Sequence, residues 1–262
     1  MDKVNRDKIR EIYMKQEVVF PMIGAVIEGN TEGEIYCNNN ENPSHIFVVN
    51  KFGFCQEIDE QRDDLFFENV IKRYIEKKDR RKLRLYNPQE ELFRYVKDLE
   101  YAQISKRMHF VMDKRYVMGT LNKSTNLKDL TISAMTEKDF EECFNLDLAT
   151  RYYSGKEDFC NNAIPIIARV EEEIVGIIYS VANDNMQCEV DIFIDEQYRN
   201  KGIALQLVSK FIKEAEQRKW IVNWDCYMNN APSMNVAKKC GFIEVKEYFY
   251  FNISNAITRS EL

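Results

Sequence analysis

The stretch Arg199-Asn200-Lys201-Gly202-Ile203-Ala204 decides the fold of this chain, because it has the composition of a turn that opens a helix. The alternating apolar residues Val190, Ile192 and Ile194 predict a strand before it. Apolar residues at helical spacing predict a helix after it: Ala204, Leu207, Val208, Phe211, Ile212 and Ala215. Such a turn gathers unpaired backbone N–H groups at the positive end of a helix dipole, which predicts an anion site of the kind that binds phosphate.

A second motif follows the turn later in the chain. A strand is predicted at 220–226, and Asn230 then leads a helix through Ser233, Val236 and Ala237 that ends at Gly241. A glycine before a surface helix also has purely structural explanations when it stands alone. The two motifs in this order resemble the acyl-coenzyme A binding core of the GNAT superfamily of N-acetyltransferases.

The resemblance implies a fold and a cofactor. Residues 121–262 are expected to form an α/β domain with a mixed sheet, the GNAT acyl-CoA N-acyltransferase fold, and residues 1–120 a smaller mixed α/β domain. The turn would bind the pyrophosphate of acetyl-CoA, a main-chain N–H of the preceding strand would stabilise the thioester oxygen, and Asn230 would contact the pantetheine arm. The expected cofactor-binding residues are Ile192, Phe193, Ile194, Arg199, Asn200, Lys201, Gly202, Ile203, Ala204, Asn230 and Ser233.

Further residues resemble the subgroup related to zwittermicin A resistance acetyltransferases. They are Glu189-Val190-Asp191-Ile192, Trp224-Asp225-Cys226, and in the first half Gly29-Asn30 with Gly33 and Asn42-Pro43-Ser44. This resemblance implies acetyl transfer to a small amine such as an aminopolyol antibiotic. Two alternatives remain: a coenzyme A-binding regulatory module with weak turnover, and an enzyme that acetylates a protein or tRNA through the basic stretch at 72–84.

A protonated amine must lose a proton before it attacks, so the reaction needs a base. Glu189 and Asp191 are the leading candidates because alternate residues of a strand share one face, with Asp225 as second choice. An exposed strand edge is the structural explanation of the same residues. In this family a tyrosine seven residues after the motif asparagine usually protonates the leaving thiolate, but here that position is Ala237. Other possible donors are Ser233, Tyr227, Tyr248 and Tyr250.

Composition bounds the remaining possibilities. With 262 residues, 45% hydrophobic and 31% charged, the chain fits a globular protein of two domains. It has no apolar run long enough to cross a bilayer and no signal-peptide core, so a cytoplasmic protein without membrane contact is expected. The seven scattered cysteines and two histidines predict no metal site. The net charge of −6 falls in residues 121–262, which disfavours nucleic acid and suits a cationic acceptor.

Periodicity and turn residues place the other elements. Helices are expected at 8–28, 61–78 and 88–105, a hairpin at 33–59, a strand at 107–113 and a linker at 119–128. Strands are expected at 130–134, 164–170, 174–181, 188–195 and 244–252. Thr136 and Asp139 form a capping box for a helix that carries Phe140, Cys143, Phe144 and Leu146.

Overall fold

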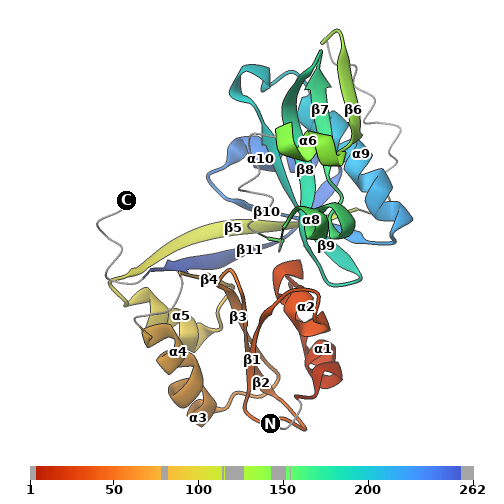
Figure 1. Ribbon diagram of the computed structural model, residues 1–262. Helices are drawn as coiled ribbons and strands as arrows, with labels where there is room; N and C mark the ends of the chain where they lie inside the picture. The colour runs from red at the N-terminus through yellow and green to blue at the C-terminus, as the bar shows by residue number, and fades with distance from the viewer. Residues whose placement is uncertain are drawn as a thin grey trace. The chain divides into compact units, whose positions relative to one another are not determined.

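The computed structural model describes residues 4–77, 82–113, 115, 127–142, 152–153 and 155–254 (Figure 1). Contacts divide the chain into two compact units: Met1–Met108 with Lys246–Leu262, and His109–Val245. Strands β5 (Ala102–Met112) and β11 (Phe242–Ile253) contribute residues to both units. The expected domain boundary at 120 and most of the expected linker lie outside the described residues, so this boundary stays a prediction.

The first unit begins with two helices, α1 (Arg6–Met14) and α2 (Pro21–Glu28). Pro21 separates them, because proline lacks the N–H that continues a helix and its fixed φ suits the first helical position. Phe20 is extended, and its carbonyl accepts a hydrogen bond of 2.8 Å from the Tyr13 hydroxyl. The prediction of one helix over 8–28 is therefore wrong.

Strands of the first unit follow the order β1-β2-β3-β4-β11-β5. An antiparallel meander of β1 (Gly33–Cys37), β2 (His45–Asn50) and β3 (Phe54–Asp59) occupies the region predicted as a hairpin. β4 (Leu83–Tyr86) was not predicted from sequence; it pairs parallel to β3 and antiparallel to β11. Its four residues are too few to show an alternation of apolar and polar side chains, so pairing with β3 and β11 determines that this segment is a strand.

Helices cover this sheet. α3 (Asp64–Phe66), the π-helical η1 (Phe67–Lys72) and α4 (Arg73–Glu76) succeed one another within the helix predicted at 61–78. α5 (Glu90–Lys97) ends well before residue 105, where the predicted helix was to end, because β5 begins at Ala102. The helices and the sheet share a buried core: Phe47, Val49, Phe67, Ile71, Leu85, Leu92, Val96 and Phe251.

Gly33 on β1 occupies a position with no room for a side chain. A Cβ there would lie 2.6 Å from the Val49 carbonyl oxygen and 2.7 Å from Val26 Cγ1. We expect Gly33→Ala to lower the free energy of unfolding by about 1–3 kcal/mol, because the added methyl group would overpack the contacts with Val49 and Val26. Urea denaturation measures it, and Gly155→Ala is the control because nothing lies within 4 Å of its added Cβ. Equal costs for the two variants would contradict the steric explanation.

The second unit is built on strands in the order β5-β10-β9-β8-β7-β6, where all neighbours from β9 to β6 are antiparallel and β9 and β10 are parallel. Its elements are β6 (Leu130–Ala134), α6 (Glu137–Glu142), α8 (Lys156–Asn162), β7 (Ile166–Val170), β8 (Glu173–Asn183), β9 (Gln187–Ile194), η3 (Glu196–Tyr198), α9 (Ile203–Gln217), β10 (Ile221–Tyr227), α10 (Ala231–Lys239) and β11. The strands and the other helices follow the predicted order, whereas α8 and η3 were not predicted from sequence. The mixed α/β class predicted from sequence is confirmed.

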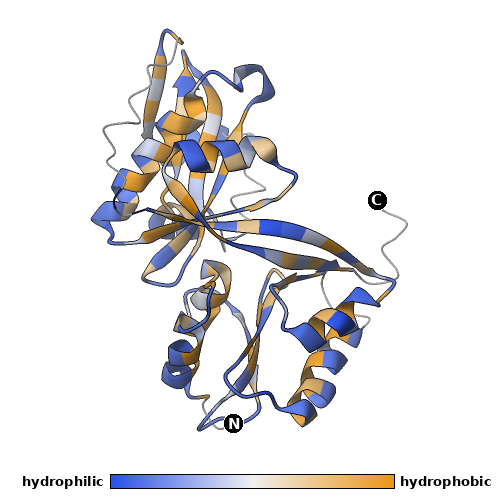
Figure 2. Cartoon of the chain, turned by 180° about the vertical axis from the view of Figure 1, so that it is seen from behind, coloured by the Kyte–Doolittle hydropathy of each residue, from blue (hydrophilic) through white to orange (hydrophobic). Residues whose placement is uncertain are grey.

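Two local predictions can be followed in the second unit. The predicted capping box is confirmed, because Thr136 Oγ1 accepts from the Asp139 N–H (3.2 Å) and Asp139 Oδ2 accepts from the Thr136 N–H (2.7 Å). Phe140 of this helix is buried, whereas Cys143, Phe144 and Leu146 lie outside the described residues. α9 carries apolar and polar residues side by side (Figure 2), and its apolar residues are buried: Ile203, Leu207, Val208, Phe211, Ile212 and Ala215.

Within the described residues, every helix is too short or too polar to cross a bilayer.

Candidate active site

The turn between β9 and α9 has the geometry of an anion site. Gly202 stands at the N-cap of α9 with φ 86° and ψ −1°, a left-handed conformation that strains any residue with a Cβ. No side chain caps this end of α9. The first-turn N–H groups, among them those of Ile203 and Ala204, therefore point out of the helix together with the positive end of its dipole. Asn200 is also left-handed, with φ 63°.

The two basic residues of the turn make local contacts. Arg199 Nε donates to the Ile194 carbonyl (3.1 Å), and its Nη1 lies 3.1 Å from Glu196 Oε1. The Lys201 ammonium lies 4.9 Å from the centre of the Tyr198 ring. Arg199 thus ties the turn to the end of β9, and both side chains are exposed beside the α9 N-terminus.

The parallel strands β9 and β10 pair over only part of their described lengths. Their register comprises Ile221 opposite Gln187, Val222 opposite Cys188 and Asn223 opposite Glu189. Asn223 closes this ladder, since its Nδ2 donates to Gln187 Oε1 (3.1 Å) and to the Cys188 carbonyl (3.3 Å). β9 runs on to Ile194 and β10 to Tyr227. An opening between the two strands therefore follows Glu189 and Asn223.

The register with β8 shows which backbone groups of β9 face this opening. Asp195 donates to the Val175 carbonyl (2.9 Å), and Gly176 lies opposite Ile194. Hydrogen-bonded and non-hydrogen-bonded pairs alternate in an antiparallel ladder, so the N–H groups of Ile192 and Ile194 point away from β8. Phe193, by the same alternation, directs its N–H toward β8. Three β9 residues were predicted to meet the cofactor. Of these, Ile192 and Ile194 direct their main-chain N–H groups toward the opening.

The second motif forms the start of α10. Asn230 is its N-cap, and its Oδ1 accepts from the Ser233 N–H (3.2 Å). Ser233 Oγ accepts from Trp224 Nε1 (3.0 Å), which links α10 to β10. Ala237 is fully buried at the position where the family usually has a tyrosine. Asn230 therefore caps α10 in the structure.

The candidate bases differ in their surroundings. Glu189 is 6% exposed and belongs to the last pair of the β9–β10 ladder. Asp191 lies two residues further along β9, is partly exposed, and accepts from the Tyr179 hydroxyl (3.2 Å). Burial, and then the Asp191 carboxylate, raise the pKa of Tyr179 well above its ordinary value. Tyr179 therefore stays protonated and acts as a donor to Asp191.

The structure adds a partner that sequence analysis missed. His109 Nδ1 on β5 lies 2.6 Å from Asp225 Oδ2 on β10, and the two side chains are 2% and 0% exposed. The residues are 116 positions apart in sequence, and no local sequence motif around either one indicates the other. Only the pairing of β5 beside β10 brings them together.

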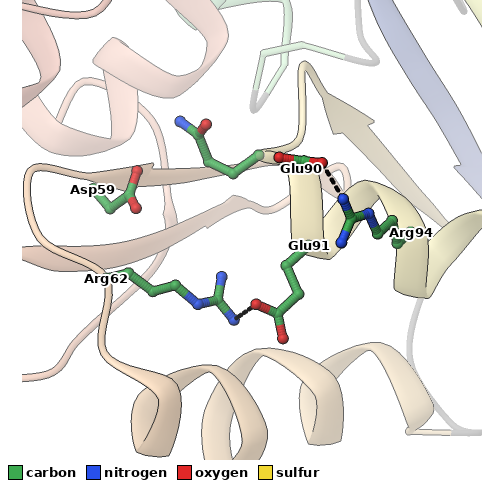
Figure 3. Close-up of a pocket in the computed structure, with 6 residues that line it drawn as sticks. Asp59, Arg62, Glu90, Glu91 and Arg94 are labelled. Atoms are coloured by element: carbon green, nitrogen blue, oxygen red, sulfur yellow. Dashed lines mark hydrogen bonds and ion pairs between the residues drawn. The ribbon is translucent and has the colours of Figure 1, made fainter.

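A cavity of about 240 Å³ in the first unit is lined by charged side chains (Figure 3). Its two arginines are paired with carboxylates of α5: Arg62 Nη2 lies 2.6 Å from Glu91 Oε2, and Arg94 contacts Glu90. The charges of these pairs compensate each other, so the cavity lacks the strongly one-signed potential that would attract a charged ligand. Among the residues that the structure describes, no group of three or more His, Cys, Asp or Glu side chains is placed to hold a metal ion.

Comparison with known proteins shows the family of the chain. The family model of the GNAT acetyltransferases matches residues 14–251. The uncharacterized N-acetyltransferase YdfB of Bacillus subtilis is 20% identical over 228 residues, which cover 86% of this chain and 87% of that protein.

Solved structures share the fold at low sequence identity. A GCN5-related N-acetyltransferase-like protein from Streptococcus suis has a TM-score of 0.71 and 18% identity, covering 94% of this chain and 97% of its own. A GNAT-family acetyltransferase from Colwellia psychrerythraea has a TM-score of 0.57 and 10% identity, with 95% of each chain covered. With the family model matching most of its length and the fold predicted from its two motifs, the chain belongs to the GNAT acetyltransferase family.

Proposed function

We propose that this acetyltransferase moves the acetyl group of acetyl-CoA directly to a small amine. The observation that carries the proposal is the early end of the β9–β10 ladder beside an uncapped helix N-terminus. Main-chain N–H groups that face an opening are suited to an amide-containing chain, and a helix N-terminus to phosphates. Both lie on β9 and on the turn that directly follows it.

The chain's own residues fit acetyl-CoA. The N-terminus of α9 and the turn would hold the pyrophosphate, because Gly202 allows the backbone to approach it without a Cβ. Ile192 or Ile194 would donate to the thioester oxygen, and Asn230 Nδ2 would meet the pantetheine arm. Acetyl-CoA supplies the activated acetyl group when bound. A carboxylate on the face of Glu189, Asp191 and Asp225 would take the proton of the amine, and Ser233 would assist departure of the thiolate.

The acceptor is proposed to be a cationic amine, with an aminopolyol antibiotic as the class suggested by the zwittermicin A resistance resemblance. The net charge of −6 supports a positively charged substrate, because it raises the local concentration of cations. Residues 1–120 are proposed to form a domain that shapes the acceptor site, and the protein is proposed to act in the cytoplasm. No step of this chemistry needs a metal ion.

Two measurements on the full chain test the function. Thermal unfolding with millimolar acetyl-CoA tests cofactor binding, since a ligand that binds only the folded state stabilises it. Release of coenzyme A thiol in a screen of diamines, polyamines and aminopolyols tests transfer. A melting temperature that acetyl-CoA leaves unmoved would refute the cofactor. Stabilisation without transfer to any amine would favour the regulatory module instead, and salt-sensitive acetylation of a protein or tRNA would favour the basic stretch at 72–84.

Asn230 can be tested for its two roles separately. Asn230→Ala removes the cap and should lower the free energy of unfolding by about 0.5–2 kcal/mol. Asn230→Asp keeps a capping oxygen for the Ser233 N–H but removes the amide donor. We expect the Asp variant to keep its stability and to bind acetyl-CoA more weakly, by about 1–3 kcal/mol if the donor meets a buried polar atom. Isothermal titration measures the binding. Unchanged affinity in the Asp variant would leave Asn230 as a cap alone.

A further inference from the structure

Asp225 has a buried carboxylate that contacts an imidazole. Its Oδ2 lies 2.6 Å from His109 Nδ1, and its side chain has no exposed surface. Removing a carboxylate from water is costly unless it is paired and hydrogen-bonded, so a fully buried one is retained where something holds it. His109 is one group that holds Asp225 in this way.

Asp225 lies beside the opening between β9 and β10. It is two residues beyond Asn223, which forms the last pair of the ladder. Continuing the register past this pair brings Asp225 level with Asp191. Because the Asn223 side chain reaches Gln187, alternate residues of the two strands share one face, which carries Glu189, Asp191 and Asp225. β5 and β9 flank β10 on opposite sides, so His109 contacts Asp225 from the side of β10 that is away from β9.

The chain contains a second buried histidine–carboxylate pair, and this second pair has a purely structural role. His45 Nε2 lies 2.8 Å from Glu57 Oε1, and both side chains are fully buried in the first unit. His45 Nδ1 accepts the Asp63 N–H (3.0 Å), so both ring nitrogens are engaged in tying β2 to β3 and to the N-cap of α3. Glu57 and His45 lie within the paired region of their strands. Asp225, by contrast, lies past the end of a ladder.

We propose that Asp225 is the proton acceptor of acetyl transfer and that His109 is a positioning residue that orients Asp225 and shares the added proton. This inference rests on the proposed function and deepens it. A proton taken from the amine would offset the negative charge of the carboxylate, and burial disfavours an uncompensated charge. A base oriented by a further hydrogen-bonded group is a recurrent arrangement in catalysis, and here the oriented base is a carboxylate.

The step balances as follows. The ammonium group of the acceptor gives one proton to the Asp225–His109 pair and becomes a neutral amine. Its nitrogen then forms a bond to the acetyl carbon while the bond from that carbon to sulfur breaks. The second proton of the nitrogen goes to the departing thiolate, which leaves as coenzyme A thiol. The pair afterwards returns its proton to water.

Titratable and charged groups on the surrounding strands bear on the pH dependence of the pair. On β9 they are Glu189 and Asp191, and on β8 Tyr179, which is already engaged with Asp191. β10 adds Tyr227, and β5 itself carries Arg107, whose guanidinium lies 4.9 Å from the Tyr250 ring. On β11, Glu244 is held by Lys238 at 2.7 Å. None of these groups is an imidazole, so a ring signal that follows the reaction identifies His109.

His109→Asn is the decisive variant. The Asn amide nitrogen occupies the place of Nδ1 and can still donate to Asp225, but it cannot take up a proton. We expect this variant to keep its melting temperature within a few degrees and to lose about 10²-fold in kcat/KM near neutral pH, together with the acidic limb of its pH profile. The probe acceptor is 1,3-diaminopropan-2-ol with acetyl-CoA. His45→Gln is the matched control for a buried pair outside the proposed site, because its amide nitrogen takes the place of Nε2, the atom that contacts Glu57.

A second measurement does not depend on turnover. The chain has two histidines, so nitrogen-15 spectra of the imidazole rings contain two ring systems, and the one lost in His109→Asn is assigned. Coenzyme A should shift the His109 ring and leave the His45 ring in place, and the His109 ring should change protonation with the same pH dependence as kcat/KM. If the probe amine is not turned over, the response of the His109 ring signal to coenzyme A alone tests the role of the pair.

The outcomes separate the two proposals. A wild-type protein that neither binds coenzyme A nor acetylates an amine overturns both. A wild-type protein that binds coenzyme A while its His109 ring stays unmoved, or a His109→Asn variant that acetylates with a wild-type pH profile, overturns the role of the pair and leaves the proposed function standing. Equal effects of His45→Gln and His109→Asn on the pH profile overturn it as well.

Discussion

Gly202→Val should abolish the stabilisation that acetyl-CoA gives to the wild-type protein. At 100 times its dissociation constant a ligand of the folded state adds about 2.7 kcal/mol to the free energy of unfolding. A branched side chain at Gly202 would stand against the phosphates at the N-terminus of α9, and its φ of 86° would be strained. The variant without ligand is therefore less stable, and with acetyl-CoA it should gain nothing.

Gly29→Val is the matched control, because it separates strain from lost binding. Gly29 has nearly the same backbone conformation, φ 85°, at the C-cap of α2. Its added Cβ would lie 3.7 Å from Arg6 Nη1, an ordinary contact. Both variants should lose roughly 1–3 kcal/mol from a non-glycine residue in this region. Only Gly202→Val should lose the shift with acetyl-CoA in differential scanning calorimetry. A full ligand shift in that variant would mean that the phosphates bind elsewhere.

Asp225→Asn should lower kcat by about 10²–10⁴-fold near pH 7, the contribution of a positioned base. Asparagine keeps the shape of the side chain and can still bond to His109, so the fold should be little changed. Part of the rate should return at higher pH, where more of the amine is already neutral. Steady-state kinetics across a range of pH with the acceptor found in the amine screen measures this effect.

Glu189→Gln provides the comparison, because sequence alone favoured Glu189 as the base. Glu189 is buried at the paired end of the β9–β10 ladder, whereas Asp225 lies past it. We expect Glu189→Gln to change kcat by less than about tenfold, well below the effect of a positioned base. A large loss in Glu189→Gln together with a normal rate in Asp225→Asn would reverse the assignment and return the role to Glu189.

Local signals account for the elements that sequence analysis predicted well. The glycine turn before α9, the asparagine cap of α10 and the capping box at Thr136 each rest on residues within four positions of one another, and the structure places helix starts at all three. Such signals act through hydrogen bonds to the nearest backbone groups, so they can be recognised without knowing the fold.

Elements that depend on distant partners were missed. β4 is a strand because β3 and β11 flank it. β5 begins at Ala102, inside the region 88–105 where the local pattern predicted a helix. The His109–Asp225 pair has the same origin, because it forms only once β5 lies beside β10. Interactions across strands have no fixed sequence spacing, and a single sequence does not reveal them. The base was sought among neighbours of the turn for this reason.

The position of β11 has a consequence for how the protein is made on the ribosome. In the first unit β11 lies between β4 and β5, and its residues Tyr250–Ile253 pair with Tyr86–Leu83. Synthesis proceeds from the N-terminus, so β4 and β5 emerge more than a hundred residues before the strand that joins them. N-terminal domains often fold first during translation. Here the first unit must wait with two unpaired strand edges until β11 has been translated. Nascent chains, rather than the folded enzyme, are therefore the form most exposed to aggregation.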